Sequence, residues 1–414
     1  MPRRQGYALL IALVAGTAAL AAVVAFTGSL LFSGTRAKAV AAPGPQGVAR
    51  TPAAAAHSTG HWLATWAAAP VRGETGPEQG TDPGLRTIRN IVHTSIGGDA
   101  ARITLSNLFG THPLRIDHVT VNTRPVTFRN APAVTVAAGG QIVSDPVAVP
   151  VAADADLVVT LRTPTARGPV TVHPNSHQTS FTEDTNGTWS TTNWRYLTAV
   201  DVRGENAGGT LVAFGDSLTA GSGSTTDANS RWPDVLADRL NGRYAVVNQG
   251  IAGNRILLDG IGPRALDRFE RDVLAVTGAK TVVIDLGIND IQAFPRQTDP
   301  THITDALRSL TERAHTRGLR VIGATLMPYE GYRNWTPAQN AVRARVNETI
   351  RAGGVFDEVL DFDRAVRDPS LPDRLLPAYD SGDHLHLNDA GYQRVGTLAD
   401  VRNLLRTRPA SDAL

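Results

Sequence analysis

The sequence predicts an α/β fold in the C-terminal half of the chain and a smaller all-β region before it. From Thr210 onward, short apolar runs alternate with stretches of helical periodicity, and glycines stand where these helices are expected to end. Between about His61 and Gly204, short runs instead alternate apolar with polar residues. We therefore expect a three-layer α/β/α domain with a five-stranded parallel sheet, preceded by a smaller domain resembling a β-sandwich.

The composition bounds the classes of protein to which the chain can belong. With 414 residues, 42% of them hydrophobic, the chain can bury more than one core, and two domains are expected. The net charge is +2 and the arginines are dispersed among acidic residues, so no nucleic-acid partner is expected. The absence of cysteine excludes disulfides, thiolate metal ligands and a cysteine nucleophile.

Residues 1–36 have the character of a signal peptide or a membrane anchor. Arg3 and Arg4 precede an apolar run from Tyr7 to Phe32, which is longer than the apolar part of most signals and could span a bilayer. The sequence leaves cleavage and retention open. In either case we expect an extracellular protein, secreted or held at the membrane by this segment alone.

Residues 37–60 are rich in alanine, proline and glycine and predict a disordered linker. The β-sandwich-like domain is expected over residues 61–205. Its tryptophans could stack on sugar rings, as in a carbohydrate-binding module, but aromatic residues of a β domain more often belong to the core. A third possibility is that one face of the domain packs on the catalytic domain and shapes its cleft. The clearest predicted strands are Arg102–Ser106, His118–Val121, Ala133–Val136 and Leu157–Leu161.

The catalytic domain is expected over residues 208–407. Its predicted strands are Thr210–Phe214, Tyr244–Asn248, Thr281–Leu286, Arg320–Thr325 and Val355–Leu360. Its predicted helices are Trp232–Asn241, Pro263–Val276, Ile303–Arg317, Pro337–Ala352 and Asp389–Leu405. Strands that alternate with helices in this way imply parallel pairing, with helices on both faces of the sheet.

The stretch from Leu211 to Gly221 places a serine directly after a buried strand. Leu211–Phe214 form the apolar run, and Gly215, Asp216 and Ser217 supply the turn that follows. Ligands of open parallel sheets bind at the carboxyl ends of the strands, where a nucleophilic serine would be useful. The same residues would also suit an ordinary strand-to-helix turn in which Ser217 caps the helix.

Three further stretches, taken with the first, resemble the signature blocks of the SGNH, or GDSL, hydrolase family. They occur in the order and spacing of that family, and the flanking sequence is similar to exported bacterial esterases and acylhydrolases with an N-terminal β domain. The resemblance implies a flavodoxin-like α/β/α layout. The four blocks are Gly215-Asp216-Ser217-Leu218, Asn248–Asn254, Gly287-Ile288-Asn289-Asp290 and Asp383-His384-Leu385-His386.

The resemblance implies a role for each site residue. Ser217 would be the nucleophile, His386 the general base and then acid, and Asp383 the carboxylate that orients the imidazole. The three-residue spacing of Asp383 and His386 on a loop suits such a pair. In the family, the oxyanion is held by two backbone N–H groups and an asparagine amide, which correspond here to Ser217, Gly253 and Asn289. Gly253 as a turn glycine and Asn289 as a loop cap are the structural alternatives.

A competing hypothesis is a metal site made by His384, His386 and Asp383. It would leave Ser217 without a role, whereas the triad uses both blocks, so we expect no metal and no cofactor.

The predicted function is a serine esterase that hydrolyses O-acyl esters, of acetyl or other short-chain groups, on carbohydrate or aryl alcohols. The expected partner is a small-molecule or polysaccharide ester. A lipase or phospholipase of the same family, or a polysaccharide-binding protein with incidental catalysis, are the alternatives. The sequence does not predict the oligomeric state, the acyl length or the natural substrate.

Overall fold

A computed structural model describes residues 60–76, 84–165, 167–204, 207–400 and 404. The predicted signal or anchor at residues 1–36 lies outside the described residues, as does the predicted linker apart from Gly60. Within the described part of the chain, no helix is long and apolar enough to cross a membrane. Residues 58–414 form one compact unit by their contacts.

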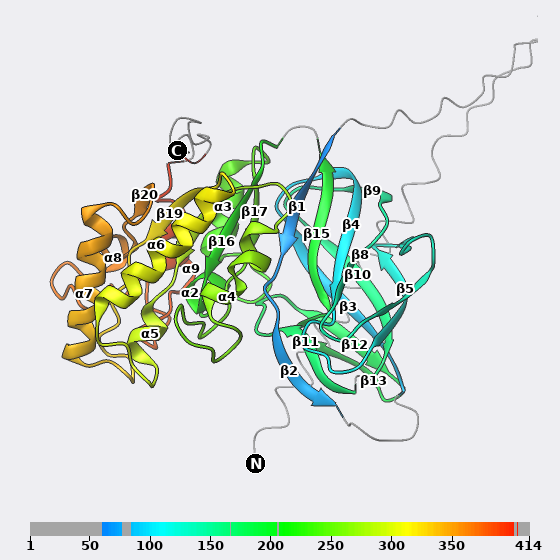
Figure 1. Cartoon of the computed structure of the whole chain (residues 1–414), viewed down its shortest axis with the longest axis horizontal. Coiled ribbons are helices and arrows are strands. Elements are labelled where there is room, and N and C mark those ends of the chain that lie inside the picture. Colours follow the sequence, from blue (N-terminus) through cyan, green and yellow to red (C-terminus); the bar gives the residue numbers. More distant parts are fainter. Residues whose placement is uncertain (1–59, 77–83, 166, 205–206, 401–403, 405–414) are drawn as a thin grey trace, which may run out of the picture. The chain divides into compact units, whose positions relative to one another are not determined.

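Residues 60–204 form a β-rich region built from antiparallel strands (Figure 1). Three sheets have the orders β1-β15-β4-β8, β13-β12-β3-β10-β5-β6 and β14-β11-β2, with β9 and β7 pairing to β4 and β5. The strands are β1 (His61–Ala67), β2 (Val71–Gly76), β3 (Leu85–Thr94), β4 (Gly98–Ser106), β5 (Leu114–Val121), β6 (Arg124–Pro125), β7 (Ala133–Val136), β8 (Gln141–Val143), β9 (Val147–Val151), β10 (Ala155–Pro164), β11 (Gly168–His173), β12 (Ser180–Asp184), β13 (Gly187–Thr191), β14 (Trp194–Arg195) and β15 (Leu197–Gly204). The four strands predicted here all lie within observed strands.

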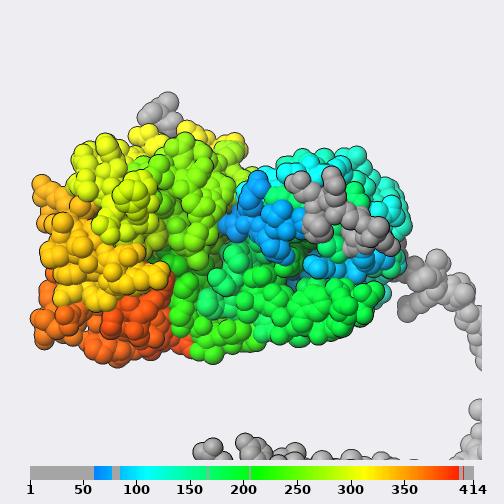
Figure 2. Space-filling model, turned by 90° about the horizontal axis from the view of Figure 1, so that it is seen from below, coloured from blue at the N-terminus to red at the C-terminus, as the bar shows by residue number. Residues whose placement is uncertain are grey.

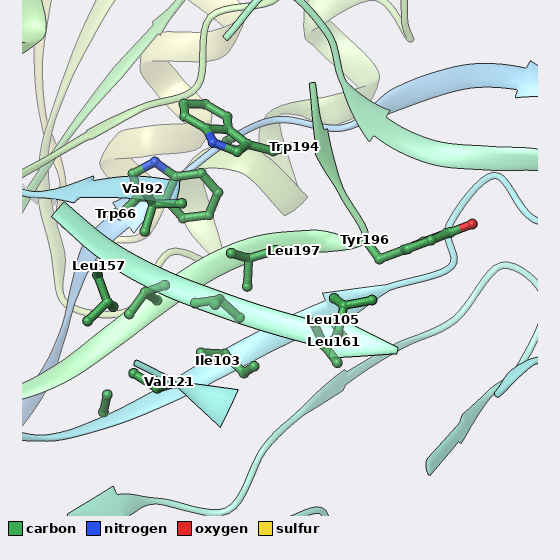
Figure 3. Packing of buried hydrophobic residues seen from close by; sticks show 14 of the residues in the cluster. Trp66, Val92, Ile103, Leu105, Val121, Leu157, Leu161, Trp194, Tyr196 and Leu197 are labelled. Carbon is green, nitrogen blue, oxygen red and sulfur yellow. The ribbon is translucent and has the colours of Figure 1, made fainter. Parts of the chain in front are cut away.

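The core of the β-rich region follows from the period-2 alternation of these strands. In β10, Leu157, Val159 and Leu161 are buried and the residues between them are not. Two tryptophans belong to this core, because the rings of Trp66 and Trp194 meet edge to face at 4.9 Å between centroids (Figure 3). Trp66 and Trp194 are therefore core residues, whereas Trp189, which the same prediction included, is 41% exposed.

Residues 210–400 contain the predicted parallel sheet, in the order β17-β16-β18-β19-β20. The strands are β16 (Thr210–Gly215), β17 (Ala245–Asn248), β18 (Ala279–Asp285), β19 (Arg320–Ala324) and β20 (Glu358–Leu360). The helices are α2 (Ser217–Ala220), α3 (Trp232–Leu240), α4 (Ala265–Phe269), the π-helical turn η1 (Glu270–Leu274), α5 (Ile288–Gln292), α6 (Pro300–Thr316), α7 (Pro337–Ala352), α8 (Phe362–Val366) and α9 (Asp389–Gly396). In chain order the sheet reads 2-1-3-4-5, the flavodoxin-like arrangement.

Helices cover both faces of this sheet, as expected. Val212 and Phe214 of β16 share a core with α4, α6 and α7. Leu211 and Ala213, which point to the opposite face, share a core with α3, α8 and α9. Every residue of β16 is buried, which is what a strand covered on both faces requires.

Three predicted elements of the α/β region were wrong in extent. The helix expected over 263–276 is broken into α4 and η1, where the N–H of Ala275 donates to the Glu270 carbonyl in a π turn. The helix expected over 389–405 is interrupted after Gly396, because residues 397–400 are not helical; residues 401–403 and 405 lie outside the described residues. Strand β20 begins only at Glu358, because the Asp357 carboxylate accepts the Val321 N–H that a longer strand would pair with its backbone.

The β-rich and α/β regions contact each other within the compact unit. Ala245 and Ile251 belong to the core cluster of the β-rich region, while Ala64 and Ala67 of β1 belong to a core cluster of the α/β region. The Ser95 hydroxyl accepts the Val246 N–H of β17 at 3.0 Å. Figure 2 shows one face of this unit, with the β-rich region in blue to green beside the α/β region in green to red. The domain boundaries themselves stay predictions.

Candidate active site

The site lies at the carboxyl edge of the sheet, where the loops that follow the paired strands β16 and β18 diverge. The chain leaves β16 toward the β17 side and crosses back to β18, so the loops after these strands open on opposite sides of the strand-order reversal. Such a switch point is where open parallel sheets bind their ligands. Ser217 follows β16 and Asn289 follows β18, so two of the predicted site residues flank this point.

Ser217 is held at the first position of α2. The Asp216 carboxylate caps the helix by accepting the Leu218 N–H at 3.0 Å. Gly215 is required just before it, because a Cβ there would lie 2.0 Å from the Thr219 hydroxyl and 2.8 Å from the Asp285 carbonyl. Asp216, and not Ser217, therefore caps the helix, and the serine hydroxyl makes a different contact.

The structure brings Ser217, His386 and Asp383 together. The Ser217 Oγ lies 2.9 Å from Nε2 of His386, and Nδ1 of the same ring lies 2.6 Å from an Asp383 carboxylate oxygen. Because an ionised carboxylate can only accept, Nδ1 carries the proton and Nε2 is left to accept from the serine hydroxyl. This is the arrangement in which a serine can lose its proton to the imidazole as it attacks.

The Asp383 carboxylate is fixed by its own loop. Its other oxygen accepts the backbone N–H groups of Leu385 and His386, at 2.9 and 2.8 Å. Burial alone would raise the pKa of Asp383, but the hydrogen bonds from His386 and Leu385 outweigh it, and the pKa lies below its usual value. Asp383 therefore stays ionised and can stabilise a protonated imidazole.

A second aspartate–histidine pair lies in the same loop. Nδ1 of His384 is 2.6 Å from an Asp380 oxygen, and the other Asp380 oxygen accepts the N–H groups of Gly382 and His384. His384 thus pairs with Asp380 and not with Asp383. Over the described residues, no group of three or more histidine, aspartate or glutamate side chains is placed to hold a metal ion.

Asn289 is buried, and its amide is fully engaged. The amide nitrogen donates to the Asp216 carboxylate and to the Asn254 carbonyl, both at 3.1 Å, and its oxygen accepts from Gln292 at 2.9 Å. An oxyanion role would therefore require one amide hydrogen to be shared with, or released by, its present acceptor. These contacts fix the side chain beside the nucleophile helix without assigning its catalytic role.

Gly253 has φ +75°, a value at which a side chain would be strained, and a Cβ there would approach the Ile261 side chain to 2.9 Å. The turn requirement considered for Gly253 is therefore real. The loop that carries it packs on α2, because the Ile251 N–H donates to the Gly215 carbonyl and a Cβ on Gly250 would lie 2.4 Å from the Ala220 nitrogen.

Arg268 of α4 is a site residue that the sequence analysis missed. The side chain of Arg268 is fully buried. Its guanidinium donates to the carbonyls of Gly215 and Gln249, both at 2.8 Å, and to the Asn254 side chain at 2.9 Å. Burial lowers its pKa to about 10, so it remains charged at neutral pH. It ties the first and second motif blocks together. The available signal was an arginine on the same helical face as Ala265 and Phe269, where an apolar residue is expected.

Two further buried carboxyl groups, those of Asp216 and Asp285, accept hydrogen bonds from the helix that begins with Ser217. The pKa of Asp216 is raised well above its usual value by burial and by the neighbouring Asp285. Burial also raises the pKa of Asp285 to about 7, and its carboxyl accepts from the Thr219 hydroxyl at 3.1 Å. For these groups, unlike for Asp383, burial outweighs the hydrogen bonds and disfavours the charged form.

Comparison with known families identifies this region. Residues 213–394 match the GDSL-like lipase/acylhydrolase family, and the match contains all four motif blocks and the three contacting residues Ser217, Asp383 and His386. This part of the chain is therefore a GDSL-like lipase/acylhydrolase domain, consistent with an SGNH family hydrolase. The family assignment agrees with the resemblance found in the sequence, and it makes the protein a hydrolase of the lipase/acylhydrolase type.

Solved structures that resemble this chain each cover about half of it. The inhibitor-bound M. smegmatis aryl esterase is 20% identical, with 47% of this chain and 99% of that one covered and a TM-score of 0.40. A carbohydrate acetylesterase from Sinorhizobium meliloti is 18% identical over 45% and 94%, at a TM-score of 0.36. A GDSL-like lipase from Bacteroides thetaiotaomicron is 21% identical over 50% and 89%, also at 0.36. No curated protein matches the chain in sequence.

Proposed function

We propose that this GDSL hydrolase is a serine esterase that cleaves O-acyl esters through an acyl-enzyme intermediate. The observation that carries the proposal is the unbroken chain of contacts from Ser217 through His386 to Asp383, at 2.9 and 2.6 Å. A serine in an ordinary helix turn would need neither contact. The Asp383 carboxylate, whose pKa is lowered, is the charged partner that the His386 imidazole requires while it is transiently protonated.

In the proposed reaction, the Ser217 oxygen attacks the ester carbonyl while Nε2 of His386 takes its proton. The oxyanion is held by the backbone N–H groups of Ser217 and Gly253 and by the Asn289 amide. His386 then returns the proton to the departing alcohol. Water attacks the acyl-serine by the same route, with His386 again as base, and releases the acid and the free serine.

The proposed substrates are esters of acetyl or other short acyl groups with carbohydrate or aryl alcohols. Apolar side chains are exposed on the loops that follow the second and third motif blocks, among them Ile261 and Phe294. Ile261 lies against Gly253, and the Phe294 carbonyl accepts from Arg255 at 3.3 Å, so both loops border the proposed oxyanion site. This exposed apolar surface supports the second candidate, a lipase or phospholipase, for which longer acyl chains would need such a surface.

A panel of chromogenic esters from C2 to C12, run beside acetylated xylan and a phospholipid, tests the proposal. We expect the highest kcat/KM for the shortest acyl groups, with acetate released from xylan. A maximum at C8 or longer together with phospholipid cleavage would support the lipase. Binding of xylan without turnover of any ester would support the binding protein. A chelator included in each assay should leave the rates unchanged, whereas loss of activity with recovery on zinc or manganese would support a metal site.

We also propose that the enzyme acts outside the cell, because of the charged and apolar pattern of residues 1–36. Fractionation of cells expressing the full chain, with activity measured in medium, membrane and cytoplasm, tests this. Activity confined to the cytoplasm would contradict it.

A further inference from the structure

One segment without regular helix or strand connects the nucleophile to the β-rich region. It runs over residues 221–231, from the end of α2 to the start of α3. At its beginning, the Gly221 and Ser222 N–H groups donate to the Ser217 carbonyl, each at 2.9 Å. Gly223 packs against the loop of the catalytic histidine, since a Cβ there would lie 2.5 Å from the carbonyl of Leu387. The segment thus contacts the backbone of Ser217 and the loop that carries His386.

The same segment is attached to α9, which begins just after His386. The Asp389 carboxylate accepts the Thr225 N–H at 2.9 Å and the Ser230 hydroxyl at 2.5 Å. The hydroxyl of the fully buried Tyr392 donates to the Ser222 carbonyl at 2.6 Å. The position of the histidine loop therefore depends on where this segment lies.

The other attachments of the segment are to the β-rich region, at the loop between β11 and β12. The Asp227 carboxylate accepts both the N–H and the hydroxyl of Thr179, at 2.5 and 2.6 Å. The Asp227 N–H donates to the His177 carbonyl at 2.9 Å, and the Arg231 guanidinium donates to the Ser176 carbonyl at 3.3 Å. The β-rich region is thereby joined to the segment that contacts the Ser217 backbone and the His386 loop.

We propose that the contact between Thr179 and Asp227, here called the clasp, positions the catalytic pair, so that the β-rich region is a working part of the active site. The proposal rests on the esterase function proposed above. Thr225 to Ala228 are exposed, so hydrogen bonds, rather than burial in a core, fix the conformation of the segment there. Because nucleophile and base must be aligned closely for reaction, loosening the clasp lowers the rate without removing any catalytic group.

The His177 imidazole supports this arrangement. Its ring is hydrogen-bonded to the backbone of Ser224, inside the same segment. Burial lowers its pKa, and the positive charge of Arg231 lowers it further, so the ring is neutral at neutral pH. It therefore braces the segment without placing a charge beside His386.

The test compares Asp227→Ala with Asp145→Ala in the full chain. Asp145 is a matched control because its carboxylate also accepts a threonine hydroxyl and backbone N–H groups, but entirely within the β-rich region. We expect Asp227→Ala to lower kcat for a soluble short-chain ester by about tenfold, with KM within about twofold. Asp145→Ala should lower Tm by about as much as Asp227→Ala does, but it should leave kcat unchanged.

Two further measurements make the result decisive. The rate at which a serine-reactive phosphonate labels Ser217 should fall in parallel with kcat in Asp227→Ala. Thr179→Val, which removes only the hydroxyl bond, should give a smaller loss in kcat, of about threefold, and it replaces Asp227→Ala if that variant does not fold. Unchanged kcat in folded Asp227→Ala and Thr179→Val, or an equal loss in Asp145→Ala, would overturn the clasp. If the phosphonate failed to label Ser217 even in the wild-type protein, the esterase proposal would fail instead.

Discussion

The α/β region and the β-rich region bury polar side chains for different purposes. In the α/β region, these side chains bind backbone carbonyls and also one another at the carboxyl edge of the sheet. Asn289 donates to the Asp216 side chain as well as to the Asn254 carbonyl, and Arg268 donates to the Asn254 side chain as well as to two carbonyls. In the β-rich region, they satisfy the backbone. The Asn107 amide donates to the carbonyls of His112, Val136 and Ala137, at 2.8 to 3.2 Å.

The difference indicates where buried polarity serves chemistry and where it serves stability. A side chain that donates to buried backbone carbonyls replaces the hydrogen bonds that those carbonyls would otherwise make with water, and it fixes the conformation of the turn. A cluster of side chains that bind one another, beside a serine and a histidine, creates a site whose charges are set by its own members. Substitutions in the α/β site should therefore change rate more than stability, and those in the β-rich region the reverse.

The largest expected effect is that of Ser217→Ala. Because serine and histidine act as a unit, kcat should fall by several orders of magnitude, while fold and substrate binding persist. Steady-state kinetics and labelling by a serine-reactive phosphonate check this. The double change with His386→Ala should cost little more, and full activity in Ser217→Ala would end the triad hypothesis.

Asn289→Ala should have the next largest effect. If the amide donates to the oxyanion, kcat should fall about 10²- to 10³-fold with little change in KM, because the interaction strengthens as negative charge develops. Removing a buried amide that is bonded to Asp216 and Asn254 should also lower Tm. A lowered Tm with kcat within a few fold of wild type would make Asn289 a structural residue only.

Asn107→Ala should have the opposite effect on rate and stability. Three carbonyl groups would lose the Asn107 amide as a donor, so we expect a loss of about 2 to 3 kcal/mol in the free energy of unfolding, with kcat unchanged. Denaturant titration and steady-state kinetics measure the two quantities. Asn186→Ala, in an exposed turn, is the control and should change neither. A large loss in kcat for Asn107→Ala at unchanged stability would contradict the division between the regions.

His173 should make the stability of the β-rich region depend on pH. Burial lowers its pKa from 6.5 to about 4, against the raising effect of the Ala69 carbonyl to which the ring is bonded. The unfolded chain therefore binds more protons between about pH 6.5 and 4, and stability is lost as the pH falls through this window. Between pH 7 and 5.5 we expect a loss of about 1 kcal/mol, measured by urea titration, that is absent in His173→Leu. An equal pH dependence in both proteins would assign the effect to other groups.

The smallest expected effect concerns acyl length. Ile261 is 57% exposed and lies against Gly253, so shortening it should remove apolar surface next to the proposed oxyanion site. Ile261→Ala should lower kcat/KM for a C6 ester relative to a C2 ester by a few fold, since one or two methylene contacts are worth about 1 kcal/mol. Leu371→Ala, an exposed apolar residue outside these loops, is the control. An unchanged C6 to C2 ratio would exclude Ile261 from acyl binding.

The sequence by itself determined the parallel sheet and the residues that meet at its edge. Alternation of apolar runs with helical periods sets parallel pairing, and parallel strands bring their following loops to one edge, so motif blocks far apart in the chain converge there. The pairing of His386 with Asp383 could also be expected, because a three-residue spacing on a turn lets the carboxylate reach one nitrogen of the ring.

Only the tertiary structure decided which partners the remaining polar groups take. Arg268 lies within a predicted helix but was not singled out in the sequence. Besides the nearby Asp272, its guanidinium binds Asn254, Gln249 and Gly215, which lie 14 to 53 residues away. The family resemblance assigns Asn289 to the oxyanion, which stays a prediction, whereas only the structure shows that its amide hydrogens donate to Asp216 and Asn254. The clasp joins residues 48 apart in different regions. Local periodicity records which face of an element is buried, whereas the partner of a buried polar group depends on what packing brings against that face.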